Sequence, residues 1–120
     1  SLMEIVKLIG SDVLPDDQKL TLEIARVIRL GFLQQNAYHA VDTYVPLPKQ
    51  LKMMQTILRL YDGVKEAVDR AIPLSQFTAT GVFDSLVKMK YEIPNDDLSG
   101  FARYEQEIDA ALAKVNAANS

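Results

Sequence analysis

The chain has 120 residues, which fits one domain with a modest hydrophobic core. Hydrophobic residues make up 48% and charged residues 24%, as in an ordinary globular protein, and the net charge is −3. This acidic balance argues against a nucleic-acid partner, and the absence of cysteine excludes disulfides and thiolate chemistry. No run approaches the roughly 20 apolar residues of a membrane span, so we expect no direct membrane insertion.

At the start of the chain, residues 1–2 precede Met3, and we interpret them as a cloning remnant. The domain then covers residues 3–120. Apolar residues on one face predict a short helix over Met3–Ile9, with Gly10 as its stop signal.

The segment Ser11–Asp17 (SDVLPDD) predicts an acidic turn that leads into a helix ending near Leu33. Pro15 is tolerated in a first helical turn, and the aspartates after it suit the positive end of a helix dipole. The acidic cluster in this turn could bind a cation, but the helix start explains it without a ligand. We therefore predict no metal site.

The segment Phe32–Tyr44 (FLQQNAYHAVDTY) combines amide side chains with aromatic and imidazole rings. Amides offer donors and acceptors, and flat rings offer stacking faces, so the segment suits a planar ligand such as a purine. The alternative is a helix end that runs into a loop and packs its own rings.

The remainder of the chain is predicted to be helical, with prolines at the breaks. The predicted elements are a connector over Asn36–Pro48, a helix over Pro48–Ala71, a turn or a single helical turn over Leu74–Thr80, a helix over Gly81–Tyr91, a break over Glu92–Asp97 and a helix over Leu98–Val115. No segment alternates with period two, so the expected fold is all-α, an irregular bundle of four to five helices.

Motifs for catalysis are missing. The chain has no glycine-rich phosphate loop, nucleophile elbow or zinc-binding pattern. Its one histidine, His39, could pair with Asp42, but a lone loop histidine more often only makes a hydrogen bond. We therefore expect a fragment, a binding module or a mechanical part of something larger.

Three stretches of the sequence carry a resemblance to a known family: LIGSDVLPDDQKLTLEIARVIRLGFLQQNAYHAVDTY, LPKQLKMMQTILRLY (Leu47–Tyr61) and KMKYEIPNDD (Lys88–Asp97). Together they closely resemble the C-terminal helical domain of the catalytic A subunit, or alpha chain, of V-type and archaeal-type rotary ATPases. More distantly, the order of segments is similar to that of the beta subunit of bacterial and mitochondrial ATP synthases.

The resemblance implies two sites. The adenine-side wall of a nucleotide site would be Gln35, Asn36, Ala37 and Tyr38, with Phe32 and Tyr44 as secondary supports. The rotor-contacting loop would be Ser11, Asp12, Val13, Leu14, Pro15, Asp16 and Asp17. The family most often has phenylalanine where Tyr38 stands, which keeps a stacking face, and a serine where Pro15 stands, so a side-chain helix cap is lost.

The resemblance also implies cofactors and partners. ATP or ADP would bind in the parent subunit, with Mg²⁺ held by residues outside this chain, so this chain alone would not hydrolyse ATP. Its partners would be the nucleotide-binding domain of the same subunit, non-catalytic B subunits in an alternating hexamer, and central-stalk subunits. The complex would couple ATP hydrolysis or synthesis to rotation and ion transport at the cytoplasmic, peripheral face of a membrane. The alternative function is a stand-alone helical adaptor that binds a partner protein.

Overall fold

The structure, a computed structural model, describes residues 14–33 and 45–120. Within these ranges every regular element is helical and no strand occurs, which confirms the predicted all-α class. The predicted helix Met3–Ile9 lies outside the described residues. No helix in the described ranges is long and apolar enough to cross a membrane.

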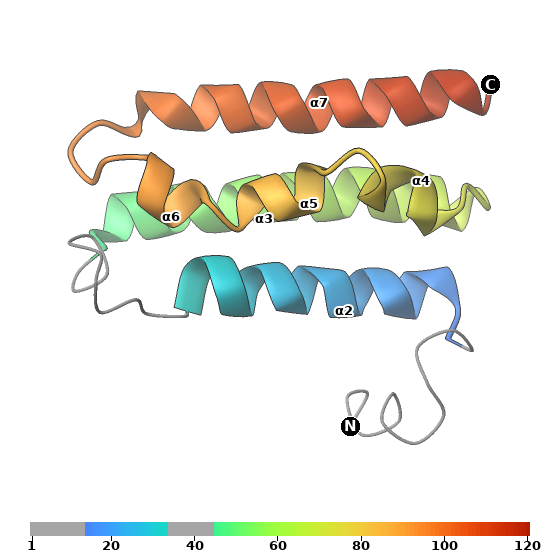
Figure 1. The fold of residues 1–120 in the computed structure, drawn as a ribbon, viewed down its shortest axis with the longest axis horizontal. Coiled ribbons are helices and arrows are strands. Elements are labelled where there is room, and N and C mark those ends of the chain that lie inside the picture. Colours follow the sequence, from blue (N-terminus) through green and yellow to red (C-terminus); the bar gives the residue numbers. More distant parts are fainter. Residues whose placement is uncertain (1–13, 34–44) are drawn as a thin grey trace.

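Three long helices lie side by side, with α3 (Leu47–Asp69) between α2 (Asp16–Ile28) and α7 (Phe101–Ala118) (Figure 1). Three short helices follow α3 and lie in front of it in this view. They are α4 (Leu74–Thr78), α5 (Val82–Leu86) and α6 (Met89–Glu92). This arrangement puts the start of α2, the end of α3 and the end of α7 at one end of the domain.

The first predicted long helix is α-helical only as far as Ile28. It then widens into a π-helical segment, η2 (Arg29–Leu33). Gly31 lies in this segment, and a Cβ built on it would meet the Cα of Val87 at 2.9 Å. The π-helical segment therefore coincides with a close approach between two backbones.

The helix predicted over Pro48–Ala71 is confirmed, with Pro48 in the first turn of α3. At its C-terminus Ala71 takes a left-handed backbone conformation, with φ of 69°. The Ile72 amide donates to the Ala67 carbonyl at 3.0 Å, and the Ala71 amide donates to the Val68 carbonyl at 2.9 Å. These two bonds make a Schellman motif, which satisfies carbonyls that the end of the helix leaves open.

The prediction of one helix over Gly81–Tyr91 is wrong, because the chain forms α5 and α6 with a turn between them. Apolar spacing cannot detect this turn, since both short helices place their apolar residues on the core side. The break falls at Val87, where the backbone of Gly31 packs against the chain. The last predicted helix is confirmed as α7, preceded by a 3₁₀ turn, η4 (Leu98–Gly100).

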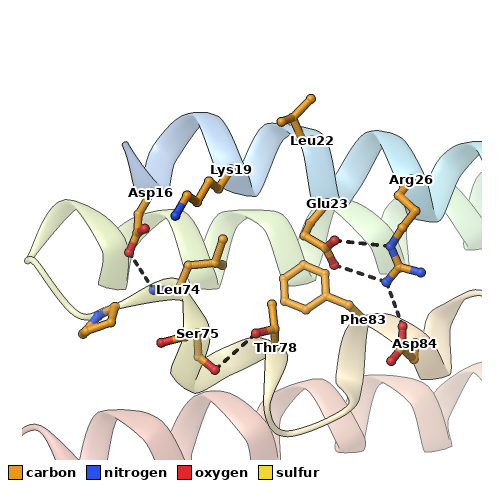
Figure 2. Close-up of a pocket in the computed structure, with 11 residues that line it drawn as sticks. Asp16, Lys19, Leu22, Glu23, Arg26, Leu74, Ser75, Thr78, Phe83 and Asp84 are labelled. Carbon is orange, nitrogen blue, oxygen red and sulfur yellow. Dashed lines mark hydrogen bonds and ion pairs between the residues drawn. The ribbon is translucent and has the colours of Figure 1, made fainter. Parts of the chain in front are cut away.

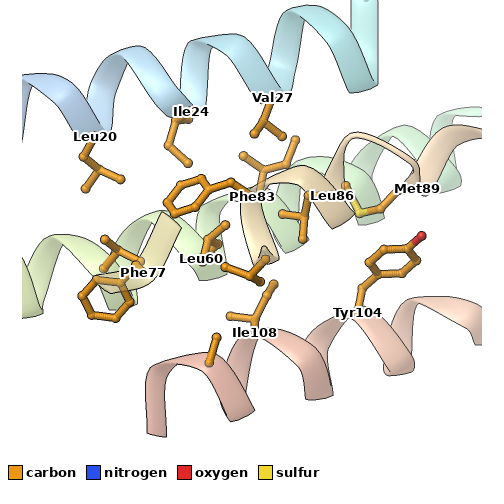
Figure 3. Close-up of a cluster of buried hydrophobic side chains, with 14 of the residues drawn as sticks. Leu20, Ile24, Val27, Leu60, Phe77, Phe83, Leu86, Met89, Tyr104 and Ile108 are labelled. Atoms are coloured by element: carbon orange, nitrogen blue, oxygen red, sulfur yellow. The ribbon is translucent and has the colours of Figure 1, made fainter. Parts of the chain in front are cut away.

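The core lies where the short helices cover the three long ones (Figure 3). Its fully buried side chains come from every layer of the bundle, and this shared core fixes the short helices on the long ones. They include Leu20 and Val27 of α2, Leu60 and Val64 of α3, Phe77 of α4, Leu86 of α5 and Ile108 of α7. Among the described residues the exposed large hydrophobic side chains all belong to α3: Leu47, Leu51 and Leu58.

Candidate functional site

The structure describes part of each predicted site. Of the adenine-side residues, Gln35, Asn36, Ala37, Tyr38 and Tyr44 lie outside the described residues, as do His39 and Asp42. Phe32 is described only as part of the backbone of η2. Of the predicted rotor-contacting loop, Ser11, Asp12 and Val13 lie outside the described residues, whereas Leu14, Pro15, Asp16 and Asp17 lie within them.

The described part of the acidic loop separates into inward-facing and outward-facing residues. Leu14 is buried, and Pro15 is the exposed residue that precedes α2. The Asp16 carboxylate accepts a hydrogen bond at 2.8 Å from the backbone amide of Leu74, the first residue of α4. Asp17 is exposed, and among the described residues its carboxylate accepts a local hydrogen bond, from the Gln18 amide at 2.9 Å. Of the two described carboxylates of this loop, Asp16 is therefore bonded to another helix and Asp17 is the exposed one.

A groove of about 640 Å³ runs from this loop along α2, between α2 and the pair α4–α5 (Figure 2). At its far end the guanidinium of Arg26 bonds the carboxylates of Glu23, at 3.2 Å, and Asp84, at 2.7 Å. These two hydrogen bonds raise the pKa of Arg26. Hydrogen bonds therefore join α2 to its neighbours at both ends of the groove, through Asp16 at one end and Arg26 at the other. Sequence periodicity could not show this groove, because it arises where short helices meet α2.

At the other end of the domain Lys49 is fully buried, with 0% exposure. Its ammonium donates to the carbonyl oxygens of Lys90, at 2.7 Å, and Ile93, at 2.5 Å, and to Oδ1 of Asn95, at 2.9 Å. Burial lowers the pKa of Lys49, and the charge of Lys90 lowers it further. The next residue, Gln50, donates from Nε2 to the Val45 carbonyl at 2.7 Å.

Sequence reasoning missed Lys49, because a lysine near a helix start normally reads as a solvated side chain. One signal was available. A cation in the first turn of a helix faces the positive end of the helix dipole, which is unfavourable without a specific partner. Here the partners are the carbonyl oxygen of Lys90 within α6, the carbonyl oxygen of Ile93 just after it, and Oδ1 of Asn95.

A third polar cluster joins α6 to α7. The carboxylate of Glu92 accepts from the hydroxyl of Tyr104 at 2.5 Å and from the guanidinium of Arg103 at 2.7 Å. The Tyr104 hydrogen bond and the Arg103 charge hold the pKa of Glu92 below its usual range, against an opposing effect of burial. Within the described ranges no group of three or more histidine, cysteine, aspartate or glutamate side chains is placed to hold a metal ion.

Comparison with known proteins places these features in a family. A family model described as the C-terminal domain of V and A type ATP synthase matches residues 1–78. The chain is 53% identical, over 91% of its length, to V-type ATP synthase alpha chain 2 of Clostridium tetani. It is 47% identical, over 83%, to the V-type ATP synthase alpha chain of Halothermothrix orenii, and 48% identical, over 80%, to the A subunit of the A-type ATP synthase of Methanopyrus kandleri. The chain spans 18%, 17% and 16% of the lengths of these three relatives.

Proposed function

Because this chain belongs to the family of C-terminal domains of V- and A-type ATP synthases, we propose that it couples nucleotide binding to rotation in the catalytic subunit of such an enzyme. In this proposal the chain supplies the adenine side of the nucleotide site and the surface that contacts the central stalk. The phosphate-binding and Mg²⁺-binding groups belong to the nucleotide-binding domain of the parent subunit, and this chain alone does not hydrolyse ATP.

The proposal is supported mainly by the positions of the first turn of α2 and the last residue of η2. The acidic residues Asp16 and Asp17 lie in the first turn of α2, and Leu33 ends η2 at the opposite end of the domain (Figure 1). The 13 residues of α2 and the 5 of η2 span about 25 Å at the rise of a helix. The proposed adenine-side residues Gln35–Tyr38 follow Leu33 closely in the sequence. A helix therefore connects the proposed sensing segment to the proposed stalk-contacting loop.

The contacts of α2 support transmission of force along it. Its first turn is bonded to α4 through Asp16 and Leu74, and its C-terminal half is bonded to α5 through Arg26 and Asp84. Its buried face packs on the shared core through Leu20, Ile24 and Val27. Packed cores do not deform continuously, so a displacement at one end moves the unit as a whole.

The proposed cycle follows from this rigidity. Contact between the adenine of ATP and Gln35–Tyr38, supported by Phe32 and Tyr44, draws the helical domain toward the nucleotide-binding domain. The acidic loop then pushes the central stalk, and the reverse motion operates in ATP synthesis. Ion transport takes place in the membrane sector, and alternating B subunits complete the hexamer at its cytoplasmic face.

The stand-alone adaptor is the weaker alternative. The three relatives are chains of ATP synthases, and each aligned stretch is less than a fifth of the relative's length. An adaptor role would also leave the amide-rich and ring-rich segment Phe32–Tyr44 without a ligand.

A charge reversal tests the stalk-contacting role. The test variant combines Asp12→Lys with Asp17→Lys in the assembled complex. Asp16 is left unchanged, so its hydrogen bond with the Leu74 amide is kept. We expect fewer ions transported for each ATP hydrolysed, with the Kd for ATP unchanged. The matched control reverses Asp62 and Asp96, two exposed aspartates on other elements. Equal coupling in both double variants would reject the stalk contact.

A further inference from the structure

We propose that the start of α3 carries a docking surface for the nucleotide-binding domain of the same subunit. The surface is the leucine patch, formed by Leu47 and Leu51 with Pro46 and Pro48 on either side of Leu47 in the chain. The inference rests on the proposed function, because it takes this chain as one domain of a longer catalytic subunit.

The leucine patch is the most exposed apolar surface of the described residues. Leu47 is 63% exposed and Leu51 is 55% exposed, and the next large hydrophobic side chain, Leu58, is 48% exposed. Leu47 and Leu51 are four residues apart, so they lie on one face of the helix, and the half-buried Met54 continues their row. A single exposed leucine is ordinary, but a row of apolar side chains on one helix face marks an interaction site.

The start of α3 also lacks the polar groups that suit a helix end in water. Such an end usually has a serine, threonine, aspartate or asparagine cap and acidic side chains in its first turn. Pro46 precedes α3 without a side-chain cap, and the first turn of α3 has no acidic residue. By contrast, the first turn of α2 contains Asp16 and Asp17. The residues at the start of α3 therefore suit an apolar neighbour better than water.

The leucine patch is held rigidly from beneath. Lys49 is fully buried and donates three hydrogen bonds at 2.5–2.9 Å to the chain at and after α6. The side-chain amide of Gln50 donates to the Val45 carbonyl at 2.7 Å. Pro46 has φ of −59°, and Pro48 lies in the first turn of α3, so the backbone here has little freedom. A surface that is already ordered loses little conformational entropy when a partner covers it.

The length of the relatives identifies the class of occupant. This chain spans 18%, 17% and 16% of the three relatives, so more than four fifths of each relative lies outside the matched domain. Domains of one chain bury about 600–1,500 Å² where they meet. A domain seen without its neighbour therefore exposes its half of that contact, and among the described residues the large exposed hydrophobic side chains all lie on α3.

The position of the leucine patch identifies the direction of approach. The end of η2 and the start of α3 lie at the same end of the domain, opposite the start of α2 (Figure 1). The proposed adenine contacts belong to the stretch of chain that joins these two points, so a nucleotide-binding domain that receives this stretch approaches from this end. The second half of α3 instead exposes Asp62, Glu66 and Asp69, which favours water or a polar partner there.

Cysteine labelling tests whether the leucine patch is covered. The variants Leu47→Cys and Leu51→Cys are made in this chain, which has no cysteine of its own, and in the isolated full-length subunit. The rate of reaction with N-ethylmaleimide is read by mass spectrometry on the peptide that contains the variant position. Ala113→Cys is the control, because it is exposed on α7 near the opposite end of the domain.

We expect Leu47→Cys and Leu51→Cys to react roughly 10-fold or more slowly in the full-length subunit than in this chain, because a covered thiol reacts only when the contact opens. Ala113→Cys should react at the same rate in both. Leu58→Cys, about 16 Å from Leu47 along the helix, should be slowed less. Both patch leucines are exposed, so the variants should fold, and Leu51→Cys decides alone if Leu47→Cys does not.

Three results would overturn the docking surface. One is an equal rate for the patch variants in this chain and in the full-length subunit. Another is protection that appears only after B subunits are added, which would assign the leucine patch to a neighbouring subunit. The third is slow labelling of this chain alone that becomes faster on dilution, which would assign the patch to a second copy of the chain.

Binding of ATP by Tyr38→Ala separates this proposal from the proposed function. If the patch variants are unprotected and Tyr38→Ala weakens ATP binding, the docking surface is wrong and the adenine role stands. If they are protected and Tyr38→Ala binds ATP as the parent subunit does, the adenine role fails and the docking surface stands.

Discussion

The backbone of Gly31 packs directly against the backbone of Val87. A Cβ atom on Gly31 would lie 2.9 Å from the Cα of Val87 and 3.1 Å from its carbonyl oxygen. This contact joins η2, which continues α2 at its C-terminal end, to the turn between α5 and α6. A side chain at this position would have to push two main-chain segments apart.

Gly31→Ala should therefore destabilise the chain, by about 1–3 kcal/mol as for other overpacked sites. Urea unfolding followed by circular dichroism measures this free energy. Gly63→Ala is the matched control, because the nearest atoms to its Cβ all belong to the half-buried side chain of Leu112, with the two terminal methyl carbons the closest. There a side-chain rotation relieves the clash, and replacing glycine inside a helix gains about 1 kcal/mol. Equal losses in the two variants would contradict this account of Gly31.

Ala71→Gly should stabilise the chain. Ala71 is exposed and has φ of 69° at the end of α3, a conformation that costs an L-residue about 1–2 kcal/mol. Glycine removes this strain but adds entropy to the unfolded chain, so we expect a net gain of about 0.5–1 kcal/mol. A lower midpoint of thermal unfolding in the variant would rule out this backbone conformation.

Leu60→Ala tests the core. Leu60 is 0% exposed, lies on α3 and faces the short helices (Figure 3), so its truncation should cost about 2–5 kcal/mol. Leu58, two residues earlier on the same helix, is 48% exposed. Leu58→Ala should change the free energy of unfolding by less than about 1 kcal/mol. Similar losses in chemical denaturation would show that α3 is rotated from its described orientation.

Glu92 should make the free energy of unfolding depend on pH in the acid range. Its pKa is held below the ordinary value in the folded chain, so the unfolded state binds more protons between the two pKa values. The contribution of Glu92 is therefore present above pH 4.5, the ordinary value, and is lost as the pH falls through the folded pKa. Glu92→Gln should flatten the fall in stability below pH 4.5 in urea titrations. A curve parallel to that of the parent chain would exclude this linkage.

The long elements could be predicted from the sequence because their determinants are local. Apolar spacing and proline positions located α2, α3 and α7 to within a few residues. The break at Val87 could not be predicted from apolar spacing, and it lies where the backbone of Gly31, far away in the sequence, packs against the chain. The same reason explains the missed groove beside α2 and the missed burial of Lys49, both of which need contacts between distant elements.

The candidate site was predictable mainly through resemblance. Composition alone left Phe32–Tyr44 open to two interpretations, and the order of segments connected it with the acidic loop. The structure then divided that loop, since Asp16 bonds Leu74 within the domain and Asp17 faces outward. A carboxylate at Asp16 looks the same as one at Asp17 in the sequence, because only the position of α4 distinguishes them.

The effect of Tyr38→Ala on the affinity for ATP, measured in the full-length catalytic subunit, tests the central claim most directly. Stacking of a base on an aromatic ring is worth about 1–3 kcal/mol, so we predict a Kd for ATP that rises roughly 5- to 100-fold. Tyr38→Phe keeps the ring face and should bind ATP as the parent does. An unchanged Kd in Tyr38→Ala, with binding stoichiometry retained, would contradict the assignment of this domain to the adenine side of the site.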